Sequence, residues 1–497
     1  MVKLLVFFVF EESLLDFRIP ELQSVADLLH VTISWEGDLD PESVFLLVEF
    51  ASLEGAKAVA DRCVLVRGLF ELWAQADDYP ALINKLRQAP HLMEEHFTQK
   101  TFKYVIESFG RSNSRQQQLD IIDQFHVLEH GGEVLMQNPD TIVWVFEDIG
   151  RKMPATAVPK QVYYTREVHL SAMHKTVLTY DLKRRPYLGT TSMPSQLSFL
   201  MANMAGVNPH TLVIDCFCGT ASLLVAAAYL RAHCWGVEID PRTLRGRIEG
   251  LNVMSNFRHY GLPIPEFVRG DMARRFFWRC PETFDAILTD PPYGARAGSR
   301  KVNEKTMEKI MVTSKEGGFT SAPIIPTEAY QLGDMLTDLL DFAAKTLRIS
   351  GRLVFWLPTT ELYSDAELPS HPCLKLLYNT EQYITIRLRR RLLTFEKIKL
   401  FEGEVPVSPQ FNPDMKHLEY ESDKYLSYKA KVEKKRKAVE RYKAEQGIQS
   451  MTRNQRRRAQ REKSAQQKEA QEGALTEEAA DGVATEAHVQ GADSTAT

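Results

Sequence analysis

The chain has 497 residues, of which 61 are Lys or Arg and 65 are Asp or Glu, so its formal net charge is −4. With 44% hydrophobic residues it can bury sizeable cores, which excludes a wholly disordered protein, and its length allows about three domains. The charge is uneven, because residues 431–468 carry a net +10 while residues 1–430 carry −7 and residues 469–497 carry −7. The near-neutral total therefore does not exclude nucleic acid as a partner.

The cysteine and hydropathy patterns bear on the compartment. Six cysteines with no C-x-x-C pair argue against a disulfide framework and against a zinc cluster, and they suit a reducing compartment. No apolar run approaches the roughly 20 residues that a helix needs to cross a bilayer. We therefore expect a cytosolic or nuclear protein, with the cytoplasm as the default, no membrane contact and no metal site.

Residues 1–180 mix short apolar runs with polar helical stretches, which predicts an α+β module. The run 2–10 meets two glutamates and lacks a small-residue cleavage site, so we expect a buried first strand rather than a signal peptide. Further strand-like runs lie at 44–50, 140–149 and 175–182, and a helix is predicted at 114–124.

Residues 181–415 alternate strand-length apolar runs with helical patterns. This alternation predicts a Rossmann-like α/β domain with a mostly parallel sheet and helices on both faces. The predicted strands are 211–217, 234–240, 265–271, 284–290 and 351–358, the predicted helices are 221–232, 242–260 and 329–347, and an antiparallel edge pair is predicted at 374–379 and 392–398.

Residues 416–497 form the third region, in which large apolar residues become rare. From residue 431 onward the chain has a single aromatic side chain, Tyr442. A segment of this composition cannot bury enough apolar surface to fold, so we expect a charged, mostly disordered tail.

Four successive strands of the predicted sheet end in an acidic residue. These are Asp215, Glu238, Asp271 and Asp290. Ligands of open α/β sheets bind beyond the carboxyl ends of the strands, so the four carboxylates are expected to share one site. One such acid alone would be weak evidence, because aspartate is common in turns and helix caps, whereas the ordered series is specific.

The residues around these acids suit a positively charged nucleoside. Asp215 can accept a hydrogen bond from an ammonium group, directly or through a water, and Gly219 lets the backbone approach a ligand. Glu238 suits ribose hydroxyls and Asp271 an adenine amine, with Ile239 and Met272 as apolar covers for the ring, although each acid taken singly is equally well explained as a solvated strand end. A pyrophosphate would be repelled and no G-x-G-x-x-G fingerprint is present, so the pattern predicts S-adenosyl-L-methionine.

The segment Asp290-Pro291-Pro292-Tyr293 is the most specific feature of the sequence. Its two prolines fix φ and remove N–H donors, which makes a rigid turn whose carbonyls can accept from a ligand amine. Asp290 can accept a hydrogen bond from an exocyclic amine, and the ring of Tyr293 can stack on a base. The segment predicts methyl transfer to an amino group of a nucleobase.

Residues 1–415 resemble the catalytic subunit of the tRNA guanosine-10 N2-methyltransferases, which are class I S-adenosylmethionine enzymes with an N-terminal THUMP-type RNA-binding domain. The resemblance rests on RPYLGTTSM (185–193), LSFLMAN (197–203), VIDCFCGTASLL (213–224), TDPPYG (289–294) and GRLVFWLP (351–358), with support from LFELWAQ (69–75) and VFEDIG (145–150). It implies methylation of guanosine 10 of tRNA at the exocyclic N2 amine. The residues expected to contact the cofactor are Thr191, Ser192, Met193, Asp215, Phe217, Gly219, Glu238, Ile239, Asp271, Met272 and Asp290.

The resemblance also implies partners for the chain. These are tRNA and a small zinc-binding activator subunit that is shared among several methyltransferases. Arg296, Arg300 and Lys301 follow the catalytic motif and are expected to grip RNA phosphates, although a solvated loop explains them equally well. Two departures from the family stand in the cofactor loop: Cys216 replaces a usual proline, and Ala221 replaces a glycine.

Two other functions remain compatible with the sequence. An amino-methyltransferase acting on adenine N6 in DNA or RNA, or on guanine in rRNA, would use the same Asp-Pro-Pro-Tyr chemistry. An inactive RNA-binding scaffold would be expected to have an eroded pocket, but the acids and Tyr293 retain chemically suitable side chains.

Overall fold

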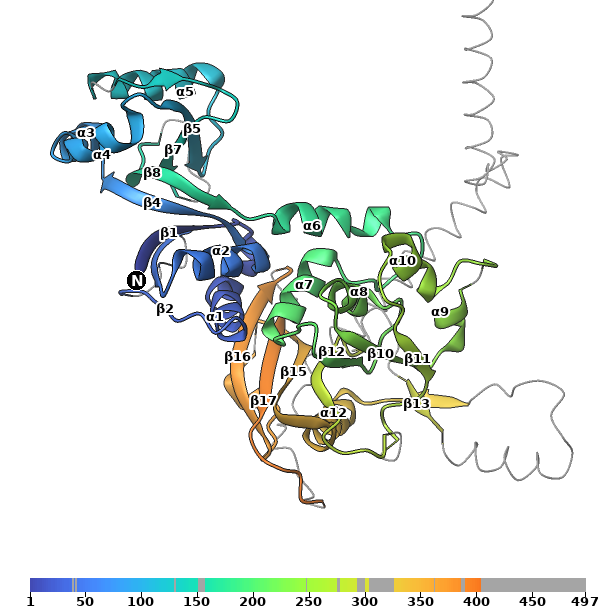
Figure 1. The fold of residues 1–497 in the computed structure, drawn as a ribbon. Coiled ribbons are helices and arrows are strands. Elements are labelled where there is room, and N and C mark those ends of the chain that lie inside the picture. Colours follow the sequence, from blue (N-terminus) through green and yellow to red (C-terminus); the bar gives the residue numbers. More distant parts are fainter. Residues whose placement is uncertain are drawn as a thin grey trace, which may run out of the picture. The chain divides into compact units, whose positions relative to one another are not determined.

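The computed structural model describes residues 1–37, 40, 43–128, 131–150, 157–246, 248–274, 278–292, 300–303, 326–361, 363–385 and 389–403. The predicted tail at 416–497 lies outside these residues. Within the described residues the chain forms an eight-stranded sheet, a seven-stranded sheet and a small two-stranded sheet (Figure 1). No helix in these ranges is long and apolar enough to span a membrane.

The N-terminal sheet has the strand order β2-β3-β1-β4-β8-β7-β5-β6. Its strands are β1 (Val2–Phe8), β2 (Ile33–Ser34), β3 (Phe45–Phe50), β4 (Val66–Ala76), β5 (Thr101–Phe109), β6 (Glu133–Val134), β7 (Thr141–Asp148) and β8 (Gln161–Leu170). The helices are η1 (Glu12–Phe17), α1 (Arg18–Leu28), α2 (Leu53–Arg62), α3 (Tyr79–Arg87), α4 (Pro90–Phe97), α5 (Arg115–Asp123) and η2 (Gln124–Val127). The α+β expectation is confirmed, and the first apolar run is the buried strand β1.

The strand predicted at 175–182 is wrong, because this segment forms α6 (Met173–Thr179) and η3 (Leu182–Arg184). Met173 and Tyr180 are buried, and Val177 packs against the same core. Their spacing of four and three residues puts them on one helical face, so contact with that core overrides the local strand preference.

The second sheet has the strand order β11-β10-β9-β12-β15-β17-β16. Its strands are β9 (Leu212–Asp215), β10 (His233–Glu238), β11 (Glu266–Arg269), β12 (Phe284–Thr289), β15 (Leu347–Thr359), β16 (Leu374–Tyr383) and β17 (Arg389–Lys397). The strands from β11 to β15 are parallel, and β17 pairs antiparallel with both β15 and β16. The predicted Rossmann-like sheet and its antiparallel edge pair are confirmed, and the strand order reverses between β9 and β12.

Helices cover both faces of this sheet (Figure 1). They are α7 (Ser195–Met204), α8 (Ser222–Tyr229), α9 (Pro241–Arg245), α10 (Val253–Tyr260) and α12 (Leu332–Thr346). Buried side chains of α7 and α8 belong to one hydrophobic core, and those of α12 belong to a second core. The helix predicted at 242–260 is divided into α9 and α10, because Gly246 and Gly250 adopt φ of +74° and +75° between them.

A buried polar network joins the N-terminal module to α7. The carboxylate of Glu21 accepts from the backbone N–H groups of 64–65 at 2.8 and 2.9 Å and from the Asn203 amide at 2.7 Å. The Nε of Arg62 donates to the Asn203 side-chain oxygen at 2.6 Å. Leu14 and Phe17 also pack in the core that contains α7, so the two modules share buried surface as well as polar contacts.

The Glu21 carboxyl gives this joint a testable pH dependence. Burial raises its pKa from 4.5 to about 7, so folding favours the protonated form and the corresponding stabilisation is complete below about pH 4.5. It is lost as the pH rises through about 7. We expect the difference in unfolding free energy between the wild type and Glu21→Gln to fall over this range by up to about 3 kcal/mol. Denaturant titrations at several pH values measure it, and a difference that does not change with pH would contradict the assignment.

Candidate active site

Asp215 connects the two strands at which the sheet order reverses. Its buried carboxylate accepts from the Thr289 hydroxyl at the end of β12 at 2.8 Å and from the Phe217 N–H at 3.0 Å. Burial raises the pKa of Asp215 to about 7, with smaller contributions from the negative charges of Asp290 and Glu238. Three of the four predicted strand-end acids therefore interact electrostatically, as expected from their places in the sheet.

The loop between β9 and α8 holds Glu238 through its backbone. Gly219 has φ of +52°, and its N–H donates to Glu238 at 3.0 Å. The other carboxylate oxygen accepts from the Asp240 N–H at 2.8 Å, and burial raises the pKa of Glu238. Both oxygens thus have one backbone donor, which leaves acceptor capacity on each for a ligand hydroxyl.

Ala221, which stands where the family has a glycine, adopts a backbone conformation that favours glycine. It is fully buried at the N-terminus of α8 and has φ of +62°. This left-handed conformation costs little for glycine but roughly 1–2 kcal/mol for a residue with a Cβ atom. The loop keeps the tight turn that the site needs, and the alanine is accommodated at the expense of backbone strain.

The turn expected to contact the cofactor is attached to the same loop. The Ser192 hydroxyl accepts from the Gly189 N–H at 2.9 Å and lies 2.7 Å from the Thr220 hydroxyl. Thr191 is exposed, and Met193 is buried. The structure thus brings the turn 189–193 against the β9–α8 loop.

Two polar residues that support these loops are not among the predicted site residues. Asn256, fully buried in α10, donates to the carbonyl of Tyr187 at 2.9 Å and accepts from its N–H at 3.0 Å. Arg185 donates to the Ser222 hydroxyl at 2.8 Å. The RPY segment was a usable signal for Arg185, but no pattern in the sequence marks Asn256.

Asp271 is tied to the short strand β13 (Arg300–Val302). Its carboxylate accepts from the N–H of Val302 at 2.6 Å and from that of Ala273 at 3.0 Å. Met272 is buried, and Ile239 is partly exposed after β10. These bonds fix the carboxylate at the end of β11, while its role toward an adenine amine stays a prediction.

The catalytic motif begins directly after β12. Asp290 is partly buried, Pro291 is buried and Pro292 is partly buried. Tyr293 and Arg296 lie outside the described residues. The three described residues of the motif therefore lie at the predicted edge of the sheet, next to Thr289.

The other two predicted phosphate contacts have partners within the protein. Arg300 donates to the Thr327 hydroxyl at 2.6 Å, across the hairpin formed with β14 (Thr327–Ala329). The ammonium group of Lys301 lies 4.0 Å from Asp334 and 5.2 Å from the ring centroid of Tyr330. These contacts anchor β13, and an RNA contact by either residue stays a prediction.

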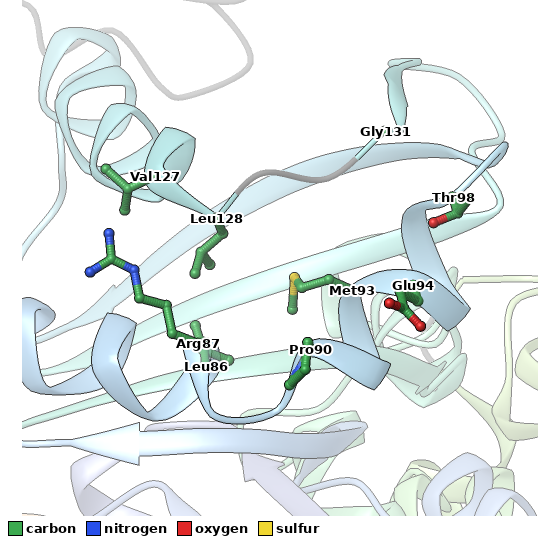
Figure 2. A pocket seen from close by; sticks show the side chains of 9 residues that line it. All are labelled: Leu86, Arg87, Pro90, Met93, Glu94, Thr98, Val127, Leu128 and Gly131. Atoms are coloured by element: carbon green, nitrogen blue, oxygen red, sulfur yellow. The ribbon is translucent and has the colours of Figure 1, made fainter.

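A cavity of about 290 Å³ lies in the N-terminal module (Figure 2). It is lined by Leu86, Arg87, Pro90, Met93, Glu94, Thr98, Val127, Leu128 and Gly131. It contains none of the predicted site residues. In the described ranges no group of three or more His, Cys, Asp or Glu side chains is arranged to hold a metal ion.

Comparisons with known proteins agree with this geometry. Residues 3–173 match the Tmrp11 THUMP N-terminal domain family, and residues 183–317 match the RMKL-like methyltransferase domain family. The tRNA (guanine(10)-N(2))-methyltransferase TRMT11 of Gallus gallus is 34% identical over 409 residues, covering 78% of this chain and 87% of that protein. The protein of the same name from Dictyostelium discoideum is 34% identical over 416 residues, covering 78% and 81%.

Among solved structures, TrmN from Thermus thermophilus aligns with a TM-score of 0.41 and 17% identity, covering 80% of this chain and all of that one. The assignment depends on the sequence relatives, which match across both modules over most of their length. The chain belongs to the tRNA (guanine(10)-N(2))-methyltransferase TRMT11 family.

Proposed function

We propose that this protein transfers a methyl group from S-adenosyl-L-methionine to the exocyclic N2 amine of guanosine 10 in tRNA. The observation that carries the proposal is that Asp215, Glu238 and Asp290 follow or end three adjacent strands beside the reversal point of the sheet, where the charges of the other two act on Asp215, in a chain of this family. The N-terminal module, which matches a THUMP family, supports RNA as the substrate.

The carboxylate cluster fits the proposed cofactor. S-adenosyl-L-methionine supplies an electrophilic methyl group on a positively charged sulfonium and also carries an ammonium group. Burial raises the pKa of both Asp215 and Glu238, so a cation offsets the cost of keeping these carboxylates ionised. We assign the ammonium group to Asp215, the ribose hydroxyls to Glu238, and the rest of the pocket to the loop at Gly219 and the turn 189–193.

Asp290 orients the nucleophile. The N2 amine of guanine is a weak nucleophile, because its lone pair is delocalised into the ring, so positioning contributes more than a strong base. A hydrogen bond from the amine to Asp290, helped by a carbonyl of Pro291 or Pro292, directs the lone pair toward the methyl group. These prolines fix the turn, so the acceptors are in place before the base arrives.

Access to the amine requires the base to leave its stack. Guanosine 10 lies in a paired stem of tRNA, so extrusion into the pocket costs a few kcal/mol. Stacking on Tyr293 would return about 1–3 kcal/mol of this, and Arg296, Arg300 and Lys301 would hold neighbouring phosphates.

The proposal includes a partner and a location. Family resemblance supports a small zinc-binding activator subunit, and copurification of the tagged chain followed by zinc analysis would test it. Six free cysteines, five of them buried, support a reducing location such as the cytoplasm. Fractionation with a cytoplasmic and a nuclear marker would test the location.

The role of Asp290 predicts a specific loss of turnover. Asp290→Ala should abolish methylation and leave tRNA affinity nearly unchanged, because the carboxylate contacts the reacting amine rather than the RNA backbone. Methyl incorporation into tRNA, nucleoside mass spectrometry and filter binding measure the two effects.

Asp341→Asn is a control, since Asp341 lies in the second half of α12, which leads to the amino end of β15, and its carboxylate is 3.5 Å from the His371 ring. It should retain activity. Wild-type turnover by Asp290→Ala would contradict the assigned role, and wild-type activity on DNA alone would contradict the proposed substrate.

The role of Asp215 predicts a pH-dependent cofactor affinity. With a pKa near 7 in the free protein, Asp215 is largely protonated below that pH, whereas a cation favours its ionised form. S-adenosyl-L-methionine should therefore bind more tightly as the pH rises to about 7, by at most about tenfold per pH unit for this group. Calorimetry from pH 5.5 to 8 measures it, and Asp215→Asn should reduce the slope. Equal slopes of cofactor affinity against pH in the wild type and Asp215→Asn would show that Asp215 does not bind the ammonium group.

A further inference from the structure

The strand β17 brings an arginine run to the edge of the sheet that carries the site. Because β17 is antiparallel to β15, its first residues lie at the carboxyl end of β15, where Arg390 pairs with Pro358. On the other side of β15, Thr289 pairs with Phe355. With strands about 4.8 Å apart and a rise of about 3.3 Å per residue, ideal sheet geometry puts the Cα atoms of Arg390 and Asp290 roughly 12 Å apart.

The guanidinium of Arg390 is held in a defined position. It lies 3.9 Å from the ring centroid of Trp356, and its Nε donates to the Gln382 side-chain oxygen at 2.6 Å. One terminal nitrogen is 4.0 Å from the sulfur of Met193, the last residue of the turn 189–193. Arg390 therefore lies between the end of β15 and the turn proposed to bind the cofactor.

Arg390 differs from the arginines on either side of it, because they form ion pairs with a carboxylate and Arg390 does not in the part of the chain that the structure describes. Arg389 and Arg391 donate to the two oxygens of Glu381 at 3.1 and 2.9 Å. Among the residues that the structure describes, no carboxylate forms an ion pair with Arg390. The ring of Trp356 and the side-chain oxygen of Gln382 offset part of the hydration that this partly buried cation loses, and a bound anion would add the missing opposite charge.

Packing alone does not explain the position of Arg390. The ring of Trp356 is fully buried, its N–H donates to the Met201 sulfur at 3.1 Å, and it packs 6.0 Å from the ring of Phe17. The tryptophan is thus held from other sides. A guanidinium stacked on an aromatic face keeps its N–H donors in its own plane, so the terminal nitrogens of Arg390 stay able to donate to a phosphate oxygen.

We propose that Arg390 binds a backbone phosphate of the substrate RNA beside the nucleotide that Asp290 holds. The inference rests on the proposed function and adds an RNA contact at the catalytic edge. Arg389 and Arg391, paired with Glu381, act as positioning residues for the start of β17. The competing anion is the carboxylate of S-adenosyl-L-methionine, because Met193 belongs to the proposed cofactor turn.

The test compares Arg390→Gln and Arg390→Lys with a control, Arg348→Gln. Arg348 pairs with Asp285 at 3.1 Å near the amino ends of β15 and β12, away from the site. Filter binding of full-length tRNA over a salt series gives the affinity and its salt dependence. Arg390→Gln should weaken binding about tenfold and reduce the slope of log affinity against log salt by about one. Arg390→Lys should keep the slope, and the control should match the wild type.

Each alternative has its own outcome. An unchanged slope in Arg390→Gln would overturn the phosphate contact. Weaker calorimetric binding of S-adenosyl-L-methionine with an unchanged salt slope would instead assign Arg390 to the cofactor carboxylate. If Arg390→Gln does not fold, Arg390→Met, which keeps an unbranched apolar stem against Trp356, takes its place, and an unchanged salt slope in that variant overturns the phosphate contact. In a further outcome, the wild type methylates no guanosine while Arg390→Gln still shows the reduced salt slope. That result would support the phosphate contact and contradict the proposed methylation target.

Discussion

The hydrogen bond between the Thr289 hydroxyl and the Asp215 carboxylate joins the ends of β9 and β12, where the order of the strands reverses. The remainder of the site is arranged around that bond. The loop after Asp215 gives Glu238 its Gly219 N–H donor, and the same loop carries Thr220, which meets Ser192. The polypeptide after Thr289 begins the catalytic motif. One buried contact thus sets the distance between the cofactor loop and the nucleophile's acceptor.

Keeping three acids close together is costly while the pocket holds no cation, and the fold meets that cost with backbone donors. Asp215 and Glu238 each accept from main-chain N–H groups, which lowers the penalty of burying a charge. The left-handed Ala221 adds backbone strain at the same loop. Local rules of stability are broken where a positively charged ligand is expected, which is typical of functional sites.

The sequence predicts the parts of this molecule that depend on short-range pattern. Strand-length apolar runs that end in acids identify β9, β10 and β12, because a buried parallel strand needs a continuous apolar stretch. The edge strand β11 is short and partly exposed, and its apolar pair Phe267 and Val268 gives a weaker signal. The run 175–182 is misassigned, since a core contact made at helical spacing outweighs local preference. Asn256, the Glu21–Asn203 bond across 182 residues and the stacking of Arg390 on Trp356 depend on tertiary proximity, which no local pattern encodes.

The helix α7 links the cofactor turn to the N-terminal module, because its two ends contact these two parts of the protein. It begins two residues after Met193, and Asn203 in its last turn bonds with Glu21 and Arg62 of the N-terminal module. Its ten residues span about 15 Å, and most of them are buried, so the helix is a packed connection between these two contacts. A displacement of the RNA-binding module must therefore either break the Glu21–Asn203 bond inside the core or shift the turn at Ser192. The first route loses a buried hydrogen bond and the second loses the partly buried bond between Ser192 and Thr220, so the module that matches an RNA-binding family is coupled to the turn that faces the cofactor loop.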